Sequence, residues 1–317
     1  MPYKIHSVVN DTVAAGTPTL IPDCTSQSIN NNPQLDAIVT AGQTMATHVI
    51  LRSQRIAADF DTLAIADAID SIGFQPLCIT TDNTSTGLVF YLSAIDGCGA
   101  ISASGHRSLT IGSGAVVPRR LSCEHRGDAS MSFDVVVAKP SANEAIVISD
   151  AANLPDLDDN GALYGGQLWT LGKMTVGNVA ISEYTSLEID FGNQVSTRGS
   201  QSDLWDSHVE VSTHSPSITI RGIDAEWFKE SGGVPIAGLA CTHANTIIYL
   251  RKRVTGSPAF AADNTNEHIK FTAKGIATIQ TAVTGQMHQF TETSLTIQCH
   301  YDGTDDPIEV DTTSQIT

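Results

Sequence analysis

The chain has 317 residues, of which 41% are hydrophobic and only 16% are charged, so it is long enough for two domains of about 150 residues with apolar cores. It carries 17 Lys and Arg residues against 34 Asp and Glu residues, and a net charge of −17 without a basic cluster argues against a general nucleic-acid-binding protein. No run of 18 apolar residues occurs and 1–6 lack the apolar core of a signal peptide, so we expect neither a membrane span nor a secretion signal.

The first half, taken as 1–150, begins with strands and then becomes polar. Asn, Gln, Thr and Pro are frequent over 28–47, which predicts a long polar loop. Apolar residues recur near helical spacing over 59–72, and Gly73 follows, which predicts a helix. The remaining apolar or alternating segments predict strands over 86–94, 109–117 and 130–138.

A linker is predicted at 151–166, because this stretch and Asp150 before it contain four Asp, three Gly and one Pro. The second half, 167–317, has a polar stretch at 195–215 and a shorter helical pattern at 224–230, followed by strands at 244–254, 268–280 and 292–300. The predicted fold class is therefore mainly β, with two tandem similar β-sandwich or open-barrel domains, each with one short helix and a long polar loop.

An internal repeat is indicated by eight segment pairs that occur in the same order in both halves. The offset is 167 for the first pair, 20–27 with 187–194, and 162 for the last pair, 132–135 with 294–297. Six pairs lie between them: 30–35 with 197–204, 49–53 with 218–222, 57–60 with 225–228, 77–80 with 239–242, 89–92 with 247–250, and 108–111 with 268–271.

Few residues have a pattern that indicates chemistry. The Gly-His-Arg-Ser sequence at 105–108 places a base near a nucleophile, but neighbouring strand residues point to opposite faces, so we expect His106 to begin a strand. His208 and His214 lack the spacing of a zinc helix, and the acidic run at 156–167 lacks the final Glu of a calcium loop. We therefore predict no catalytic residue, no cofactor, no metal ligand and no enzymatic activity, and we expect the six cysteines to be reduced core residues.

The order of strands, polar loop, strand, short helix and further strands resembles the tail tube protein of long-tailed bacteriophages. The segments that carry this resemblance are 20–60 with 187–228 and 113–137 with 273–299. The resemblance is one of architecture and composition, because the family has no short diagnostic motif. It covers nearly the whole chain, once in each half.

The resemblance implies a virion protein, made in the host cytoplasm, whose rings have a continuous β-barrel as inner wall. A duplicated chain would form trimeric, pseudo-hexameric rings, and these would stack into a tail tube whose acidic channel lets DNA pass without specific binding. The expected partners are other copies of the chain and other tail proteins. The polar loops would bridge to the next ring, which makes the expected contact residues Asn30, Asn31, Asn32, Pro33, Arg198, Gln201 and Trp205.

Three other functions remain open from the sequence. The chain could be a different virion component, namely a capsid, decoration or connector protein. It could also be a receptor- or glycan-binding β-sandwich that uses an exposed aromatic residue such as Trp205. An enzyme that uses His106 or His243 is the remaining alternative.

Overall fold

The computed structural model describes residues 2–12, 18–79, 87–139, 144–151, 153–155, 167–177, 179–181, 183–199, 204–223, 242–254, 257–284 and 292–317. For 242–244 and 280–284 the description covers the backbone alone. Within these ranges the protein is mainly β, as predicted, and its one helix is α1 (Ile65–Ile72).

The strands of the first half are β1 (Tyr3–Asn10), β2 (Thr19–Ile21), β3 (Cys24–Asn31), β4 (Gln34–Ile38), β5 (His48–Ser53), β6 (Ile56–Thr62), β7 (Leu77–Ile79), β8 (Leu88–Ala94), β9 (His106–Ile111), β10 (Gly114–Glu124), β11 (Ser130–Val137) and β12 (Val147–Ala151). Those of the second half are β13 (Trp169–Val176), β14 (Val179–Ile181), β15 (Tyr184–Asp190), β16 (Asn193–Arg198), β17 (His208–His214), β18 (Ser217–Gly222), β19 (Thr242–Lys252), β20 (His268–Thr284), β21 (Glu292–Cys299) and β22 (Ile308–Ser314).

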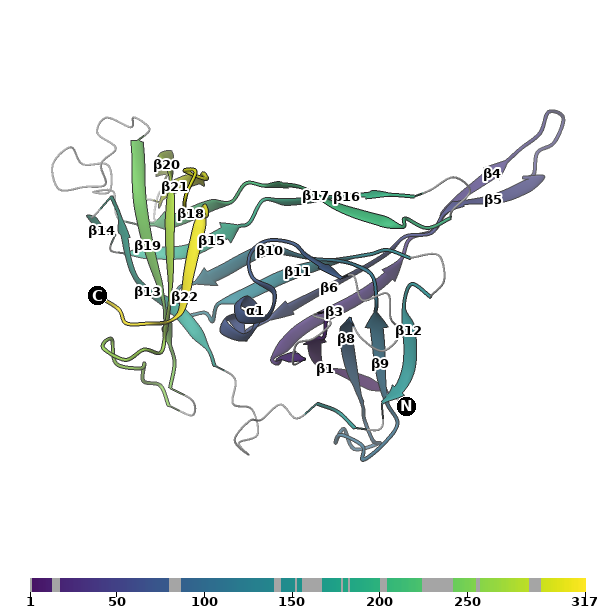
Figure 1. Ribbon diagram of the computed structural model, residues 1–317, viewed down its shortest axis with the longest axis horizontal. Coiled ribbons are helices and arrows are strands. Elements are labelled where there is room, and N and C mark those ends of the chain that lie inside the picture. The colour runs from purple at the N-terminus through teal and green to yellow at the C-terminus, as the bar shows by residue number, and fades with distance from the viewer. Residues whose placement is uncertain are drawn as a thin grey trace.

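Most of the strands belong to two antiparallel sheets (Figure 1). The smaller sheet has the order β12-β9-β8-β1-β2, and the larger sheet has the order β14-β13-β19-β20-β21-β18-β15-β10-β11-β6-β3, with β22 beside β20 and β7 beside β10. The pairs β4–β5 and β16–β17 are separate hairpins. Since the larger sheet contains strands from both predicted domains, the two halves of the chain share one continuous sheet.

Side-chain alternation gives the larger sheet one apolar and one polar face. In β11, half-buried and buried residues alternate, as period-two geometry requires. Cross-strand pairing extends the buried positions into a row that crosses both halves: Met131, Leu121, Ile189, Ile218 and Ile297. The next row is polar and also crosses both halves: Ser26, Asp61, Ser132, Arg120, Asp190, Ser217 and Gln298.

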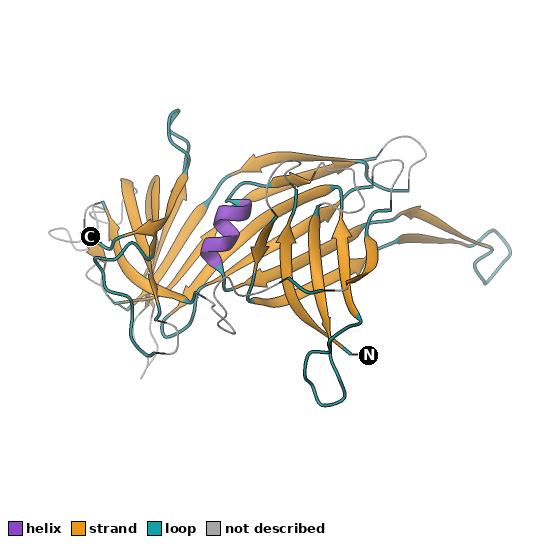
Figure 2. Cartoon of the chain, turned by 60° about the horizontal axis from the view of Figure 1, so that its bottom comes forward, coloured by secondary structure: helices purple, strands orange, loops and turns teal. Residues whose placement is uncertain are grey.

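The helix α1 packs into the core through Ile65, Ala68, Ile69 and Ile72, and it lies near the middle of the molecule, across the strands (Figure 2). It ends at Gly73, whose φ of 82° is in the left-handed region that glycine tolerates. The predicted helix over 59–72 is wrong in its first part, because alternate side chains of β6 are buried there and the segment pairs as a strand. The second predicted helix, 224–230, lies outside the described residues.

Both segments predicted as polar loops contain strands. The segment 28–47 contains the end of β3, all of β4 and the turn before β5, and 195–215 forms most of the β16–β17 hairpin. The loop prediction is wrong for these strand residues and holds for 39–47, because Asn, Thr and Ser favour turns but also lie here on strands that are largely exposed.

Most predicted strands are confirmed, although 109–117 is divided between β9 and β10. The predicted linker begins at Ala151, the last residue of β12, and 156–166 lie outside the described residues. The five described cysteines are free; Cys123 and Cys299 are buried and Cys24 is half-buried, but Cys78 and Cys98 are exposed, contrary to the prediction. Burial raises the pKa of the Cys123 thiol to about 11. No helix among the described residues is long and apolar enough to cross a membrane.

Candidate assembly surfaces

The seam between the two halves is a direct strand pairing of β10 with β15. Leu121 lies opposite Ile189 and Arg120 lies opposite Asp190. Beyond the end of β15, the N–H group of Phe191 donates to the Arg119 carbonyl at 3.0 Å, which continues the ladder. The larger sheet is therefore uninterrupted where the halves meet, and backbone hydrogen bonds hold them together.

Aromatic packing strengthens the seam. Phe74, which follows α1 in the first half, stacks on Phe191 of the second half with ring centroids 5.0 Å apart. The same ring contacts Phe271 of β20 at 5.9 Å. Phe191 and Phe271 are fully buried, so this cluster joins the cores of the two halves.

The β16–β17 hairpin belongs to the second half but lies on the first (Figure 1). At its base, the buried Asn193 amide donates to the carbonyls of Phe74 and Pro118, at 2.8 Å in both cases. At its tip, Trp205 forms a parallel bridge with Gln54 and packs against the core. We call this element the seated hairpin.

Other contacts fix the tip of the seated hairpin. The Lys139 ammonium lies over the Trp205 ring, 5.8 Å from its centroid, and the Lys139 N–H donates to the Asp206 carbonyl at 2.9 Å. The Asp206 carboxylate lies 3.3 Å from the Arg55 guanidinium. The first half therefore provides a built seat for the tip, from residues after β11 and between β5 and β6.

The strand pairings of the two halves follow one scheme. Eight pairings of the first half match whole pairings in the second: β1–β2 with β13–β14, β1–β8 with β13–β19, β3–β6 with β15–β18, β6–β11 with β18–β21, β8–β9 with β19–β20, β9–β12 with β20–β22, β10–β11 with β20–β21, and β4–β5 with β16–β17. The ninth, β7–β10, matches the start of β19–β20. We call residues equivalent when they hold the same place in matching pairings.

Irregularities of the ladders also coincide. The bulge near the start of β3 skips Thr25, and the bulge near the start of β15 skips Thr185, which fixes an offset of 160 there. Two hairpin bulges, after Gln34 and after Gln194, keep the same offset. The hairpin loops 39–47 and 199–207 are therefore equal in length, and Met45 is equivalent to Trp205.

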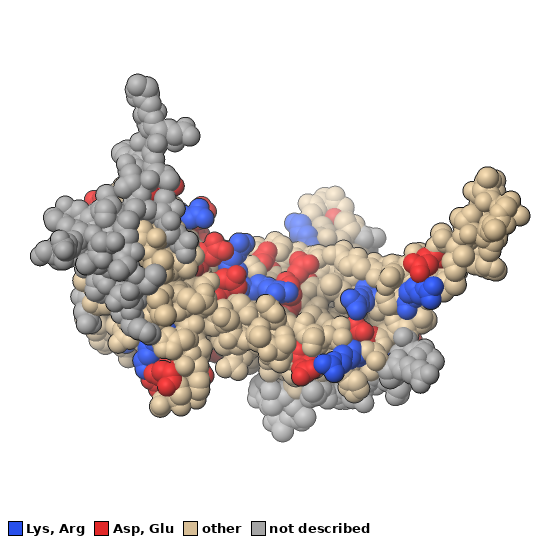
Figure 3. All heavy atoms as spheres, turned by 90° about the horizontal axis from the view of Figure 1, so that it is seen from above, with Lys and Arg blue, Asp and Glu red and all other residues tan. Residues whose placement is uncertain are grey.

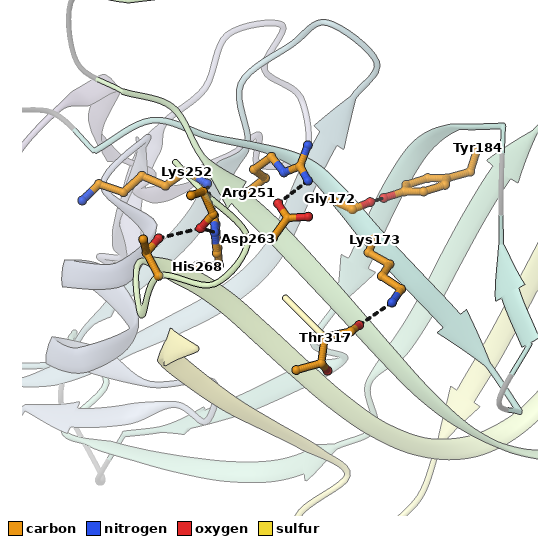
Figure 4. A network of polar contacts seen from close by, with 10 residues as sticks. Gly172, Lys173, Tyr184, Arg251, Lys252, Asp263, His268 and Thr317 are labelled. Atoms are coloured by element: carbon orange, nitrogen blue, oxygen red, sulfur yellow. Dashed lines mark hydrogen bonds and ion pairs between the residues drawn. The ribbon is translucent and has the colours of Figure 1, made fainter. Parts of the chain in front are cut away.

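Two buried histidines are equivalent as well. The Nδ1 atom of His106, the first residue of β9, accepts the N–H of Ala94 at 3.1 Å. At the start of β20, Nδ1 of His268 accepts the N–H of Lys252 at 3.3 Å, and Figure 4 shows these two residues side by side. Each imidazole thus satisfies a backbone donor, which is a structural use of the ring that the sequence pattern did not predict.

Two glycines repeat in the same way. Gly114 begins β10, and a Cβ added to it would lie 2.0 Å from the Val136 carbonyl oxygen. A Cβ added to Gly275, within β20, would lie 2.5 Å from the Gln298 carbonyl oxygen. Val136 and Gln298 are equivalent, with an offset of 162. Only glycine permits this close approach of the neighbouring strand.

The structural offsets correct several of the segment pairs seen in the sequence. The pairs 89–92 with 247–250 and 132–135 with 294–297 have the register of the structure. The pair 108–111 with 268–271 is wrong by two residues, and the alignments of 20–27, 30–35 and 49–53 are wrong. The pair 57–60 with 225–228 is wrong, because the equivalents of 57–60 in β18 are 217–220. The pair 77–80 with 239–242 is wrong as well, because 77–79 pair with 114–116 as 242–244 pair with 275–277. The expected partners 225–228 and 239–241 lie outside the described residues.

The strands equivalent to β15 and β10 do not pair with each other in the described chain, although β15 and β10 do. The equivalent of β15 is β3, which is the edge of the larger sheet and, among the described strands, pairs only with β6. The equivalent of β10 beyond Pro118 is the end of β20 beyond Ile279. There β20 pairs with β21 on one side, while on the other side its pairing with the described part of β19 extends to Ala277.

The β4–β5 hairpin, equivalent to the seated hairpin, projects from the body as an arm (Figure 1). An ion pair at its base joins Arg52 to Asp36 at 2.8 Å. Between them, 37–51 contain no Asp, Glu, Lys or Arg. Its exposed apolar side chains include Leu35, Val39, Met45, Val49 and Ile50, with Met45 the most exposed at 79%.

Charge on the polar face of the larger sheet is mixed but predominantly acidic. Ion pairs join Arg119 to Asp134 at 2.6 Å and Arg120 to Glu188 at 3.4 Å. The long face in Figure 3 shows acidic and basic side chains side by side along the body and an arm that carries charge near its base. The charged residues on the polar face include the acidic Asp59, Asp61, Glu124, Asp134, Glu188, Asp190, Glu309 and Asp311 and the basic Arg119, Arg120, Arg221, Lys270 and Lys274.

The residues expected to form contacts are divided between the two hairpins. Asn30 and Asn31 end β3, Asn32 and Pro33 connect it to β4, and all four are exposed. In the seated hairpin, Arg198 is exposed, Trp205 is engaged within its own chain, and Gln201 lies outside the described residues. The sequence did not indicate Asn193, Lys139 or Tyr301, because their importance depends on long-range pairing.

His214, the last residue of β17, is a titratable group at the base of the seated hairpin. Its Nδ1 lies 2.6 Å from Oδ1 of Asn193, and burial lowers the pKa of the imidazole. The side chain of His243 lies outside the description. Within the described residues, no three His, Cys, Asp or Glu side chains gather into a group that could hold a metal ion.

A comparison with protein-family models finds no family that matches this sequence. A comparison with curated proteins finds no match either.

Proposed function

We propose that this chain is a structural protein that assembles head to tail into rings and, by stacking of rings, into a tube of the phage-tail type. The observation that carries the proposal is the seam: a strand pairing joins the halves within the chain, and its equivalent has both sides unjoined in the described chain. Contacts between unlike surfaces propagate from copy to copy and close into a ring when the rotation permits.

The proposed contact pairs β3 of one copy with the end of β20 of the next. In the register of the seam, Asn30 of one copy lies opposite Thr281 of its neighbour. Three chains would then close a ring of six similar halves, in which three seams lie within chains and three between them. Such pairing satisfies edge strands that would otherwise invite uncontrolled aggregation.

The polar face supports an internal channel. The row from Ser26 to Gln298 runs through the seam, so repeated pairing would extend it around a ring. Small polar and acidic side chains on such a wall repel phosphate groups and leave DNA free to pass without specific binding. In this proposal the ring is part of a virion, and its partners are further copies of the chain and other tail proteins.

Association of the purified chain tests the proposal. We expect rings or tubes in negative-stain electron micrographs and a concentration-dependent rise of mass in analytical ultracentrifugation. Closed shells would indicate a capsid protein instead, and a monomer that persists at high concentration would contradict self-assembly.

A proline at the β3 edge identifies the contact. Phe191 donates across the seam, and alternation makes Leu187 donate to the same side; the equivalent of Leu187 is Gln27. Gln27→Pro removes that donor and should weaken association at least tenfold, as loss of about 1–3 kcal/mol implies. Gln27→Val retains the N–H group and should assemble like the wild type; equal association of both variants would contradict the β3 contact.

A further inference from the structure

We infer that the β4–β5 arm of each copy docks on the second half of the neighbouring copy, with Met45 seated against Tyr301. This inference rests on the proposed head-to-tail assembly and adds a second contact to it. The arm then crosses the seam between neighbours in one ring, and does not reach from one ring to the next as the resemblance implied.

The seated hairpin supplies the template for this contact. It belongs to the half that contributes β15 to the seam, and it lies on the half that contributes β10. The arm belongs to the half that carries β3, so the same relation places it on the half of the neighbour that carries β20. The two hairpins share pairing register and loop length, which gives them the same reach.

The position of the docking site follows from the seat of Trp205. Lys139 forms that seat, and its equivalent is Tyr301, because the N–H of Ala138 donates to the Ser113 carbonyl as that of His300 donates to the Lys274 carbonyl. Tyr301 is 61% exposed and Met45 is 79% exposed. Two exposed apolar groups from different halves thus hold the places of two residues that touch within the chain.

The chemistry of the two pairs is matched, though the residues differ. In the seat within the chain, an ammonium group lies over an indole ring. In the contact between chains, a thioether would lie against a phenol ring, a favourable arrangement for sulfur and aromatic groups. The ion pair of Arg55 with Asp206 has no counterpart, since Ser215 and Ala46 hold these places.

The occupant of this surface is a second copy of the chain. The arm is uncharged between Asp36 and Arg52, so it does not offer ion pairs to a charged partner. The body already carries a hairpin seated on the equivalent surface, and the arm has the same strand pairing as that hairpin. Each copy provides one arm and one free seat, as a head-to-tail series requires.

Site-directed cross-linking tests the contact. In a chain with Cys78→Ser and Cys98→Ser, which removes the two thiols exposed among the described residues, and with Cys241→Ser, Met45→Cys and Tyr301→Cys are combined and treated with a short bismaleimide. We expect a ladder of covalent oligomers in denaturing gels. The single variants, and the pair Ile101→Cys with Tyr301→Cys, should give no ladder above background, because Ile101 is exposed but lies outside the arm.

Association measurements provide a second readout. Met45→Ser and Tyr301→Ala should each weaken assembly about tenfold and leave the melting temperature of the monomer unchanged. Ile148→Ser, at an exposed position of β12, should have no effect. Assemblies that form without cross-linking and are insensitive to both substitutions would overturn the arm contact and leave the proposed function standing. Absence of any assembly by the unmodified chain would overturn both.

Discussion

The two hairpins β4–β5 and β16–β17 have the same strand register and loop length but different surroundings. The second is held by the buried amide of Asn193 and by Trp205 in its seat, whereas the first extends from the body with its apolar tip exposed. The difference arises because β16–β17 lies on the first half of its own chain, whereas β4–β5 contacts no equivalent surface within the described chain. The contacts of the seated hairpin therefore serve as a model for how the exposed hairpin could dock on another copy.

Residue differences distinguish the contact within the chain from the one proposed between chains. Phe191 is buried at the seam, but its equivalent is the exposed Asn31. Asn193 pins the seated hairpin, but its equivalent is Pro33, which has no side-chain donor. We therefore expect the contact between chains to be weaker than the contact within the chain and to depend on concentration.

Truncation of the hairpin tips should give the largest contrast. Trp205→Ala removes a large side chain that packs on the core and should lower the free energy of unfolding by about 3 kcal/mol. Met45→Ala removes an exposed side chain and should change it by less than about 0.5 kcal/mol. Chemical denaturation of monomeric samples measures both, and equal effects would show that the hairpins do not differ as described.

The buried histidines test how alike the halves are. His106→Leu and His268→Leu each leave a backbone donor without its acceptor, so each should lower the free energy of unfolding by about 2 kcal/mol. Denaturant titrations of both variants give the comparison. If one substitution is costly and the other is neutral, the two imidazoles do not have matching roles.

Substitutions at the bases of the two hairpins should differ in destabilisation by less than those at the tips. Asn193→Ala loses the bonds to the Phe74 and Pro118 carbonyls and should destabilise the monomer by about 1–2 kcal/mol. Pro33→Ala, at the equivalent exposed position, should have little effect on the monomer. Hydrogen exchange can localise the change, and faster exchange should be confined to the seated hairpin and its contacts.

Acidification should have the smallest effect and should act on the seated hairpin. Burial lowers the pKa of His214 below its unfolded value of 6.5, so the unfolded chain binds more protons as pH falls through that value. The stability contribution is complete above pH 6.5 and decreases below it. Melting curves between pH 7.5 and 5.5 should show a smaller decrease for His214→Gln than for the wild type; since burial also lowers the pKa of His6, part of the decrease should remain.

Individual strands were largely predictable from the sequence, but their partners were not. Alternation over β11 and β21 gave both the strands and their correct relative register, because their buried positions are strongly apolar. At 108–111 a two-residue shift preserves the inward and outward pattern, so the alignment could not distinguish the true register. Alternation identifies a strand but not its partner, so the pairing of β10 with β15 could not be predicted from the sequence.

The candidate contact residues show the same limit. The three Asn residues and the Pro at 30–33 favour a polar connection, and they do lie where β3 passes into the arm. The sequence did not indicate Tyr301 as a contact residue, because it lies beyond the last aligned segment pair and its neighbours form no motif. Its candidacy depends on Lys139 and Trp205, whose contact exists only in the folded chain.

The covalent joining of the halves also has a consequence for how the protein can change over time. A protein built from identical single halves would have the same residues at every seam, so any substitution would alter all seams at once. In the proposed assembly, substitutions in β10 or β15 act on the folding of one chain, whereas substitutions in β3 or at the end of β20 would act on the association of two chains. Stability and association can therefore be selected separately.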